Sequence, residues 1–253
     1  MKKFLLSILI ALVVLVILGV VAVSLFLDSA VKKGIETVGP MLAKVEVKLD
    51  SVSLSLLSGS GKIRGLLIGN PEGFKTPSAI QVGNASLALQ PGSILGDKVI
   101  IRSVLVEGPE ITFETDLKAN NLSKILANLQ AATGGTDTSK TPAQAKSGRK
   151  LQVDDFRISG GKIHVSVTTL GAQSATVALP EVHLTDLGKG PDGITGAELA
   201  TLVIQAIEKE AVQASSGVVS DLARQASGLT KDLNKAESDA AKKLGVGDLL
   251  KKK

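Results

Sequence analysis

The residues best suited to catalysis are few in this chain, and their spacing fits no common active site. The stretch Gly59-Ser-Gly-Lys62 resembles part of a phosphate-binding loop. The full pattern needs Gly where Leu56 stands and Ser or Thr where Ile63 stands, so a turn is expected instead. Asp154 and Asp155 are adjacent and would point to opposite faces of a strand, which argues against a paired-carboxylate site.

The histidines also fail to form a recognisable site. His164 and His183 lack the close spacing and the carboxylate neighbours of a metal site, so we expect them on the surface of strands. There is no G-x-S-x-G motif, and the absence of cysteine excludes thiolate metal sites, cysteine nucleophiles and disulfides. These residues predict a protein that is not an enzyme and that holds no metal or cofactor. A hydrolase that depends on His164 is the enzymatic alternative.

The charge pattern argues against a nucleic-acid partner. The chain of 253 residues has a formal net charge of +5, but much of this charge lies at its ends, at Lys2, Lys3 and Lys251 to Lys253. Trp and Tyr are absent, so there is almost no aromatic surface on which bases could stack. We interpret the terminal lysines as solvated tails.

The first informative segment predicts a membrane anchor. Phe4 to Leu27 is a run of 24 residues without a charged side chain. As a helix at ~1.5 Å per residue it would be ~36 Å long, enough to cross a ~30 Å hydrocarbon layer. A cleaved signal peptide is the alternative, although its apolar part is usually only ~7–15 residues. Lys2 and Lys3 place the N-terminus in the cytoplasm, so residues 1–28 form a cytoplasmic tip and an anchor.

After the anchor, the apolar residues recur at every second position, which is typical of strands. Val45, Val47 and Leu49 would share one face of a strand, and a change of parity predicts a bend near residue 50. Similar short runs, separated by Gly, Pro and Asn, predict an antiparallel sheet within residues 29–190.

Two segments interrupt or follow the predicted sheet. A short amphipathic helix is predicted at 120–132, followed by a polar, mobile loop at 133–150. Residues 191–253 are predicted to be helical, with a capping box formed by Thr195 and Glu198.

The C-terminal region is expected to contain two amphipathic helices. The apolar side of the first is Leu199, Leu202, Val203, Ala206 and Ile207. The narrow, alanine-rich stripe of the second is Leu222, Ala226, Leu229, Leu233, Ala236, Ala240 and Leu244. Such a stripe suits three uses: packing on the sheet, lying on a membrane surface, or pairing with a partner helix.

One phrase of the sequence occurs twice. "VLVEGPEITFE" at 104–114 and "FRISGGKIHVS" at 156–166 are offset by 52 positions (156 − 104), with apolar residues alternating around a glycine. Each copy predicts a hairpin with one apolar face, which a hairpin cannot bury by itself. The copies must therefore stack, close on each other or hold an apolar ligand, and a β-sandwich with meeting apolar faces is the alternative. The candidate lipid-binding residues are Val104, Val106, Ile111, Phe113, Phe156, Ile158, Ile163 and Val165.

A series of short phrases resembles a known family. The segment "SLLSGSGKIRGLLIGNPEGFKTPSAIQVGNASLALQPGSILGDKVIIRSVLVEGPEITFE" at 55–114, followed by "NLSKIL", "LQVDDFRISGGKIHVSV" and "ALPEVHLTDLG", is similar to the bacterial AsmA-like proteins over about residues 1–210. This resemblance implies a periplasmic protein anchored in the inner membrane and related to the chorein-like lipid-transfer bridges. It also implies a taco-shaped sheet whose groove takes acyl chains of phospholipid or another lipid. The expected role is in cell-envelope lipid homeostasis, lipid transport or outer-membrane biogenesis.

Together these features predict a mainly β fold with α-helices: an N-terminal transmembrane helix, an antiparallel twisted sheet and C-terminal amphipathic helices. The predicted protein is single-pass, lies mostly in the periplasm of a Gram-negative bacterium, and binds lipid on an apolar groove. Because the chain is shorter than the long AsmA-like proteins, a short carrier or a segment of an assembly fits better than a complete bridge. The alternative is a structural or adaptor module that binds no lipid and docks an envelope protein partner through its C-terminal helices.

Overall fold

The computed structural model describes Val14, Val23 and residues 26–94, 96–134, 149–170 and 173–243. The predicted anchor and the predicted mobile loop therefore fall almost entirely outside the described residues. Within the described parts, no helix has both the length and the apolar character needed to cross a membrane.

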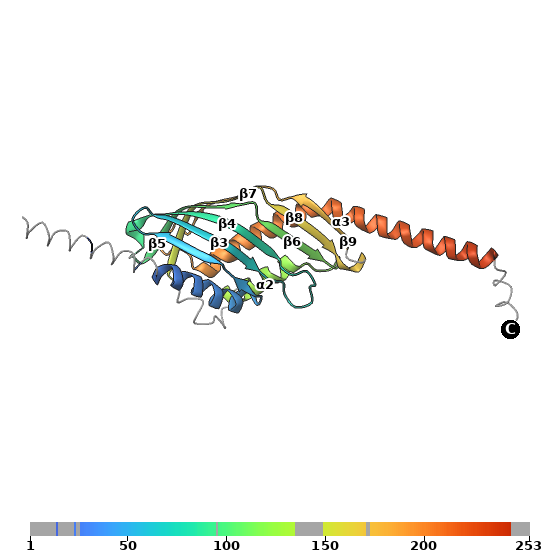
Figure 1. The fold of residues 1–253 in the computed structure, drawn as a ribbon, viewed down its shortest axis with the longest axis horizontal. Helices are drawn as coiled ribbons and strands as arrows, with labels where there is room; N and C mark the ends of the chain where they lie inside the picture. Colours follow the sequence, from blue (N-terminus) through green and yellow to red (C-terminus); the bar gives the residue numbers. More distant parts are fainter. Residues whose placement is uncertain are drawn as a thin grey trace, which may run out of the picture.

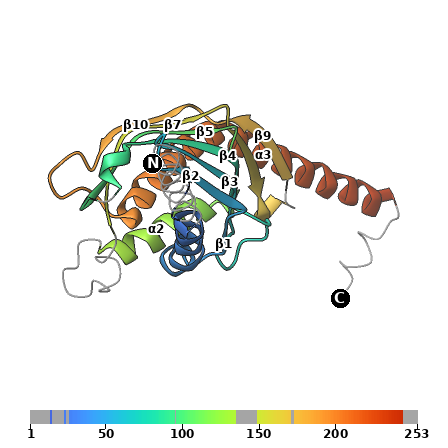
Figure 2. The ribbon, with the colours of Figure 1, turned by 60° about the vertical axis from the view of Figure 1, so that its left-hand side comes forward.

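The chain forms a curled sheet packed on helices, which confirms the mainly β class with α-helices (Figures 1 and 2). The strands are β1 (Val47–Lys48), β2 (Ser51–Ser55), β3 (Ser60–Ile68), β4 (Ile80–Leu89), β5 (Lys98–Glu107), β6 (Glu110–Thr115), β7 (Lys150–Ser159), β8 (Lys162–Val167), β9 (Gln173–Ala178) and β10 (Val182–Leu187). The helices are an N-terminal helix at 26–43, α2 (Asn121–Thr133) and α3 (Gly196–Lys243), with 3-10 turns η1 (Pro91–Ser93) and η2 (Thr168–Leu170).

The ten strands behave as six long strands, most of them interrupted in the middle. β5 and β6 pair with β4 in a common register, with Asn84 opposite Glu107 and Ile80 opposite Ile111, and a shift of register occurs only near the far end of β4, between Ala88 and Leu89. β1 and β2 share a register along β3 in the same way, and β9 and β10 continue each other along β8 and β7. The six long strands then follow one another across the sheet in chain order.

The sheet is mixed, so the prediction of an antiparallel sheet is wrong in one part. β7 runs parallel to β5, and β8 runs parallel to β6. Parallel neighbours need a connection that returns the chain to the starting edge. Here that connection runs from the end of β6 through α2 to the start of β7.

The predicted hairpins are also wrong, because the glycine of each repeat bends the chain without reversing it. Gly108 and Gly160 adopt φ values of 58° and 65°, a left-handed conformation that suits glycine. The strands continue beyond them: Gly108 N donates to Ser159 O at 2.8 Å, and Lys162 N donates to Pro109 O at 2.9 Å. The glycine at the centre of each repeat is therefore an irregularity within a long strand.

These irregularities belong to a line of neighbouring residues across the sheet, which we call the crease, formed by residues 50, 65, 83, 108 and 160, of which Gly65, Gly108 and Gly160 have a positive φ. The registers place each of these residues next to the following one. At Gly65 (φ 61°) a Cβ atom would lie 1.9 Å from Asp50 Oδ2, so no side chain fits there. Glycines with positive φ at the same level in neighbouring strands allow a sheet to bend strongly there.

The helices confirm most of the predicted boundaries. Asn120 caps α2 by accepting from Ser123 N at 2.8 Å, and Leu122, Ile125 and Leu129 are buried as their spacing predicts. The capping box at the start of α3 is present, with Thr195 N donating to Glu198 Oε2 at 2.6 Å.

The prediction of two C-terminal helices is wrong. α3 is one continuous helix of 48 residues that passes through Gly217 without a break. An interior glycine costs only ~1 kcal/mol relative to alanine, and Ala214 and Val218, which pack against the core before and after Gly217, offset this cost.

The curled sheet encloses the helices on its concave side, which we call the inner face (Figure 2). α2 and α3 pack against each other there, and α3 also packs against β6, β8, β9 and β10. The N-terminal helix lies along the edge formed by β1 and β2. The convex side, which we call the outer face, carries mainly polar residues.

Candidate functional site

The eight candidate lipid-binding residues all lie on the inner face. The parallel register pairs them copy by copy, with partners 52 positions apart: Val104 with Phe156, Val106 with Ile158, Ile111 with Ile163 and Phe113 with Val165. Each is at most 8% exposed, and all belong to one core with side chains of α2 and α3. The two copies of the repeat therefore build adjacent parts of one continuous apolar wall.

The cover of this wall comes largely from the first half of α3, whose buried residues include several small ones. The buried residues are Ala197, Ile204, Ile207, Ala211 and Ser215, of which the two alanines and the serine are small. The buried face of the helix is rotated relative to the predicted face, because Leu202 is 39% exposed whereas Ile204 is buried.

Ser215 is an unusual component of this cover. Its side chain is 1% exposed, and its hydroxyl has no hydrogen-bond partner among the described residues. A buried hydroxyl without a partner costs about 1–3 kcal/mol. Small residues such as Ala211 also make fewer dispersion contacts than leucine would. The contact between α3 and the sheet is thus weaker than its buried area suggests.

An open groove of about 540 Å³ lies where α3 leaves the sheet beside β9. Its walls are Ala175, Val218, Asp221, Leu222, Arg224 and Gln225. Val218 and Leu222 also pack against the core, so the groove joins the inner face directly. We call it the mouth of the inner face.

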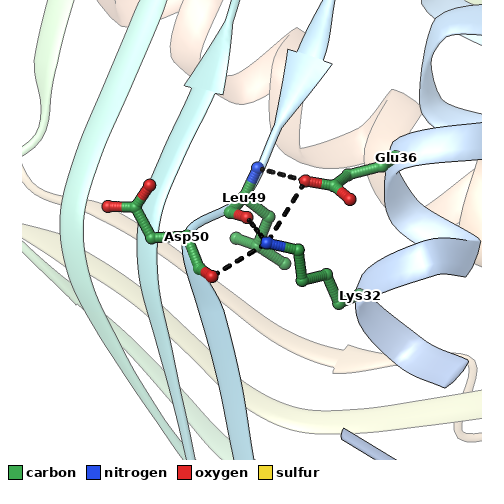
Figure 3. Close-up of polar contacts among 4 residues, drawn as sticks. All are labelled: Lys32, Glu36, Leu49 and Asp50. Carbon is green, nitrogen blue, oxygen red and sulfur yellow. Dashed lines mark hydrogen bonds and ion pairs between the residues drawn. The ribbon is translucent and has the colours of Figure 1, made fainter. Parts of the chain in front are cut away.

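The N-terminal helix is tied to the exposed edge of the sheet by side-chain contacts to backbone (Figure 3). Lys32 Nζ donates to the carbonyl oxygens of Leu49 and Asp50, and Leu49 N donates to Glu36 Oε1 at 3.0 Å. Asp28 accepts from Leu54 N at 2.7 Å. These contacts occupy edge groups that could otherwise pair with another strand, and they fix the sheet to the segment that carries the predicted anchor.

A buried polar network, absent from the sequence prediction, lies on the outer side of β6. Glu114 is 1% exposed, and its carboxylate accepts from Lys75 N at 2.8 Å, Thr76 N at 2.8 Å and Thr76 Oγ1 at 2.6 Å. Asn121 Nδ2 donates to Asn70 Oδ1 at 2.8 Å, and Asn70 in turn donates to Thr76. The network fastens the loop at 69–79 to β6 and to the start of α2. The length of that loop is the only sequence signal of such a cover.

The histidines form surface pairs. His183 Nε2 lies 2.6 Å from Asp155 Oδ1, and His164 contacts Thr176 at 3.1 Å and Glu110 at 3.7 Å. No group of three or more potential metal-binding side chains occurs in the described part of the chain.

The two adjacent aspartates do not alternate between faces as predicted. Val153 and Phe156 are both buried, so the two residues between them share the outer side at an irregularity of β7. Asp154 accepts from Gln152 Nε2 at 2.7 Å, whereas Asp155 contacts His183. The separate partners leave the carboxyl groups unsuited to act as a pair.

Comparison with known proteins assigned no relative. No family model, no curated protein and no solved structure matches this chain.

Proposed function

We propose that this chain is a membrane-anchored, periplasmic lipid-binding protein of AsmA-like type, whose inner face takes acyl chains. The role would be in cell-envelope lipid homeostasis, lipid transport or outer-membrane biogenesis. The observation that carries the proposal is the continuous apolar wall built by the repeat, which α2 and α3 cover, with small side chains and an unpaired hydroxyl among the buried residues of α3.

An acyl chain is the apolar ligand that suits such a wall. Burying apolar surface contributes about 25 cal/mol per Å², irrespective of whether the cover is a helix or a lipid tail. A lipid that displaces part of α3 would therefore keep the wall out of water. It would also release Ser215 from its unfavourable position.

The mouth offers a place for this exchange to begin. It is open to solvent, it is bordered by the apolar side chains of Val218 and Leu222, and it lies at the point where α3 leaves the sheet. Helix segments beyond such a point open at lower free energy than the packed core.

The proposed anchor would hold the sheet close to the bilayer. Phe26 is 75% exposed, as expected for a side chain at the membrane interface. The contacts of Asp28, Lys32 and Glu36 to the sheet edge make the connection rigid.

The test is photocrosslinking of the full chain in vesicles that contain phospholipid with a diazirine in its acyl chain. We expect labels on inner-face peptides of β6, β8 and α3, in addition to the anchor. Leu222→Glu, which places a charge in the mouth, should abolish labelling of the inner face. Gln213→Glu is the matched control, because it adds the same charge at an exposed position of the same helix. Labels confined to the anchor in every variant would refute acyl binding.

The second candidate is a structural or adaptor module. The eight inner residues are already covered by the chain's own helices, and α3 extends beyond the sheet as an arm that a partner helix could use (Figure 1). If the inner face stays unlabelled while the anchor is labelled, this candidate replaces the first.

A further inference from the structure

A second surface with the character of a binding site lies on the outer face, at the strands nearest the N-terminal helix. A hollow of about 340 Å³ there is lined mainly by hydroxyl and cationic side chains: Ser51, Ser53, Ser55, Ser60, Lys62 and Arg64. The register places Ser51 opposite Arg64 and Ser53 opposite Lys62, so each cation lies beside a hydroxyl. We call this surface the basic hollow.

The cations of the basic hollow have no carboxylate partner in the part of the chain that the structure describes. Lys62 and Arg64 are exposed and take part in none of the ion pairs there. Asp50 N donates to Arg64 O at 3.0 Å, but the Asp50 carboxylate lies over the neighbouring Gly65 and forms no ion pair with either cation in the described chain. A lysine and an arginine beside the hydroxyls of Ser53 and Ser51 suit a phosphodiester, because its oxygens accept hydrogen bonds from both kinds of group.

The basic hollow lies at the end of the molecule from which the anchor would emerge. Asp28 contacts Leu54 in the same strand as Ser53 and Ser55, so the first turn of the N-terminal helix is beside the hollow. Leu57, in the turn between β2 and β3, is 81% exposed, and Phe26 is 75% exposed. Two exposed apolar side chains thus flank a cationic surface at one end of the sheet.

We propose that the basic hollow binds the headgroups of anionic phospholipids, with Leu57 inserted into the boundary between headgroups and acyl chains. Basic side chains near an anionic leaflet gain from its surface potential, and apolar side chains beside them enter the interface. This contact orients the sheet relative to the bilayer. It rests on the membrane anchoring in the proposed function, and it concerns a different surface from the inner face.

The absence of native cysteine makes a single-site fluorescence test possible. The full chain with Leu57→Cys, labelled with the environment-sensitive dye NBD, is reconstituted into vesicles of phosphatidylcholine alone or with added phosphatidylglycerol. We expect a blue shift of NBD emission and quenching by lipids with spin labels in their acyl chains, both greater in the anionic vesicles. Lys118→Cys, in the exposed turn after β6 at the other end of the strands, should show neither effect.

Charge variants identify the residues responsible. Lys62→Glu with Arg64→Glu should abolish the difference between anionic and neutral vesicles, and Lys62→Gln with Arg64→Gln should reduce it. Lys124→Glu, on the exposed side of α2, should leave it unchanged. Circular dichroism confirms that each variant is folded.

Flotation of the vesicles separates the two ways in which the inference could fail. If the chain floats with the vesicles but NBD at position 57 gives the same signal in both lipid compositions, the headgroup site is refuted and the anchor stands. If the chain does not float, the anchoring fails and this inference fails with it.

Discussion

The two faces of the curled sheet bury their side chains by different means. The inner face is a continuous apolar wall in which residues of one repeat lie beside their counterparts in the other. The outer face has polar side chains grouped into separate areas. Around β7 and β10, Arg157 contacts Asp155 at 3.8 Å and Glu181 at 3.6 Å, whereas Lys62 and Arg64 of the basic hollow have no such partners in the described chain. Because the buried apolar side chains lie on the inner face, we expect most of the stability to come from that face and surface charge on the outer face to contribute little.

The largest expected effect is a cavity in the inner face. Ile163 is fully buried, and Ile163→Ala should reduce the free energy of unfolding by about 3–5 kcal/mol. The next residue along β8 provides the control, because His164→Ala on the outer face should change it by less than about 1 kcal/mol. Denaturant unfolding followed by circular dichroism measures both. Equal losses would contradict the division between the faces.

The buried network around Glu114 is an exception, because we expect this part of the outer face to contribute to stability. Glu114→Ala would leave the backbone N–H groups of Lys75 and Thr76 without their acceptor, so we expect a loss of about 2–3 kcal/mol. Glu110→Ala, at an exposed position of the same strand, should have little effect. Hydrogen exchange should show the loop at 69–79 opening in the first variant only. An unchanged loop would mean that the network does not hold it.

A smaller difference in stability is expected between alanine substitutions at two glycines of the crease. Gly65→Ala puts a side chain at a positive φ and against Asp50, with an expected loss of about 2 kcal/mol. Gly83→Ala is the control in the adjacent strand, because a Cβ there would meet no atom within 4 Å. Thermal unfolding of both variants decides the point. Similar melting temperatures would show that the crease tolerates ordinary residues.

The smallest effect concerns the turn between β6 and α2, which belongs to neither face. Backbone N–H groups of Ala119 and Lys118 donate to Asp116 and lower the pKa of its carboxyl group. Because the folded pKa is below the unfolded one, the stabilisation is present above the unfolded pKa and is lost as the pH falls through the folded pKa. Asp116→Asn should remove this part of the acid dependence. If the variant lost as much stability between neutral and acidic pH as the native chain, Asp116 would not contribute to the acid dependence.

Local patterns predicted much of the fold. The alternation of Val45, Val47 and Leu49 matches their burial, and Asn120 begins α2 as the spacing of its leucines suggests. Within each strand the candidate residues share one face because strand periodicity specifies which side chains point the same way, and the irregular backbone at Gly108 and Gly160 keeps that face common to both parts of each long strand.

Other features depend on partners far away in the sequence. Glycine at positive φ serves equally in a turn and in an irregular strand, so the sequence around Gly108 did not distinguish a hairpin from the crease. The burial of Glu114 depends on a loop about 40 residues upstream, and alternation assigned it simply to the polar side.

The sequence alone therefore determined the apolar wall, its two copies and the helices that could cover it, because these follow from the periods of strand and helix. The tertiary structure decided that the copies lie side by side in parallel, that α3 is a single helix, and that a basic hollow adjoins the N-terminal helix. The reason is that the pairing of strands, the covering of the sheet by helices and the position of the hollow depend on contacts between segments far apart in the sequence. Periodicity within one segment does not specify which other segments it contacts.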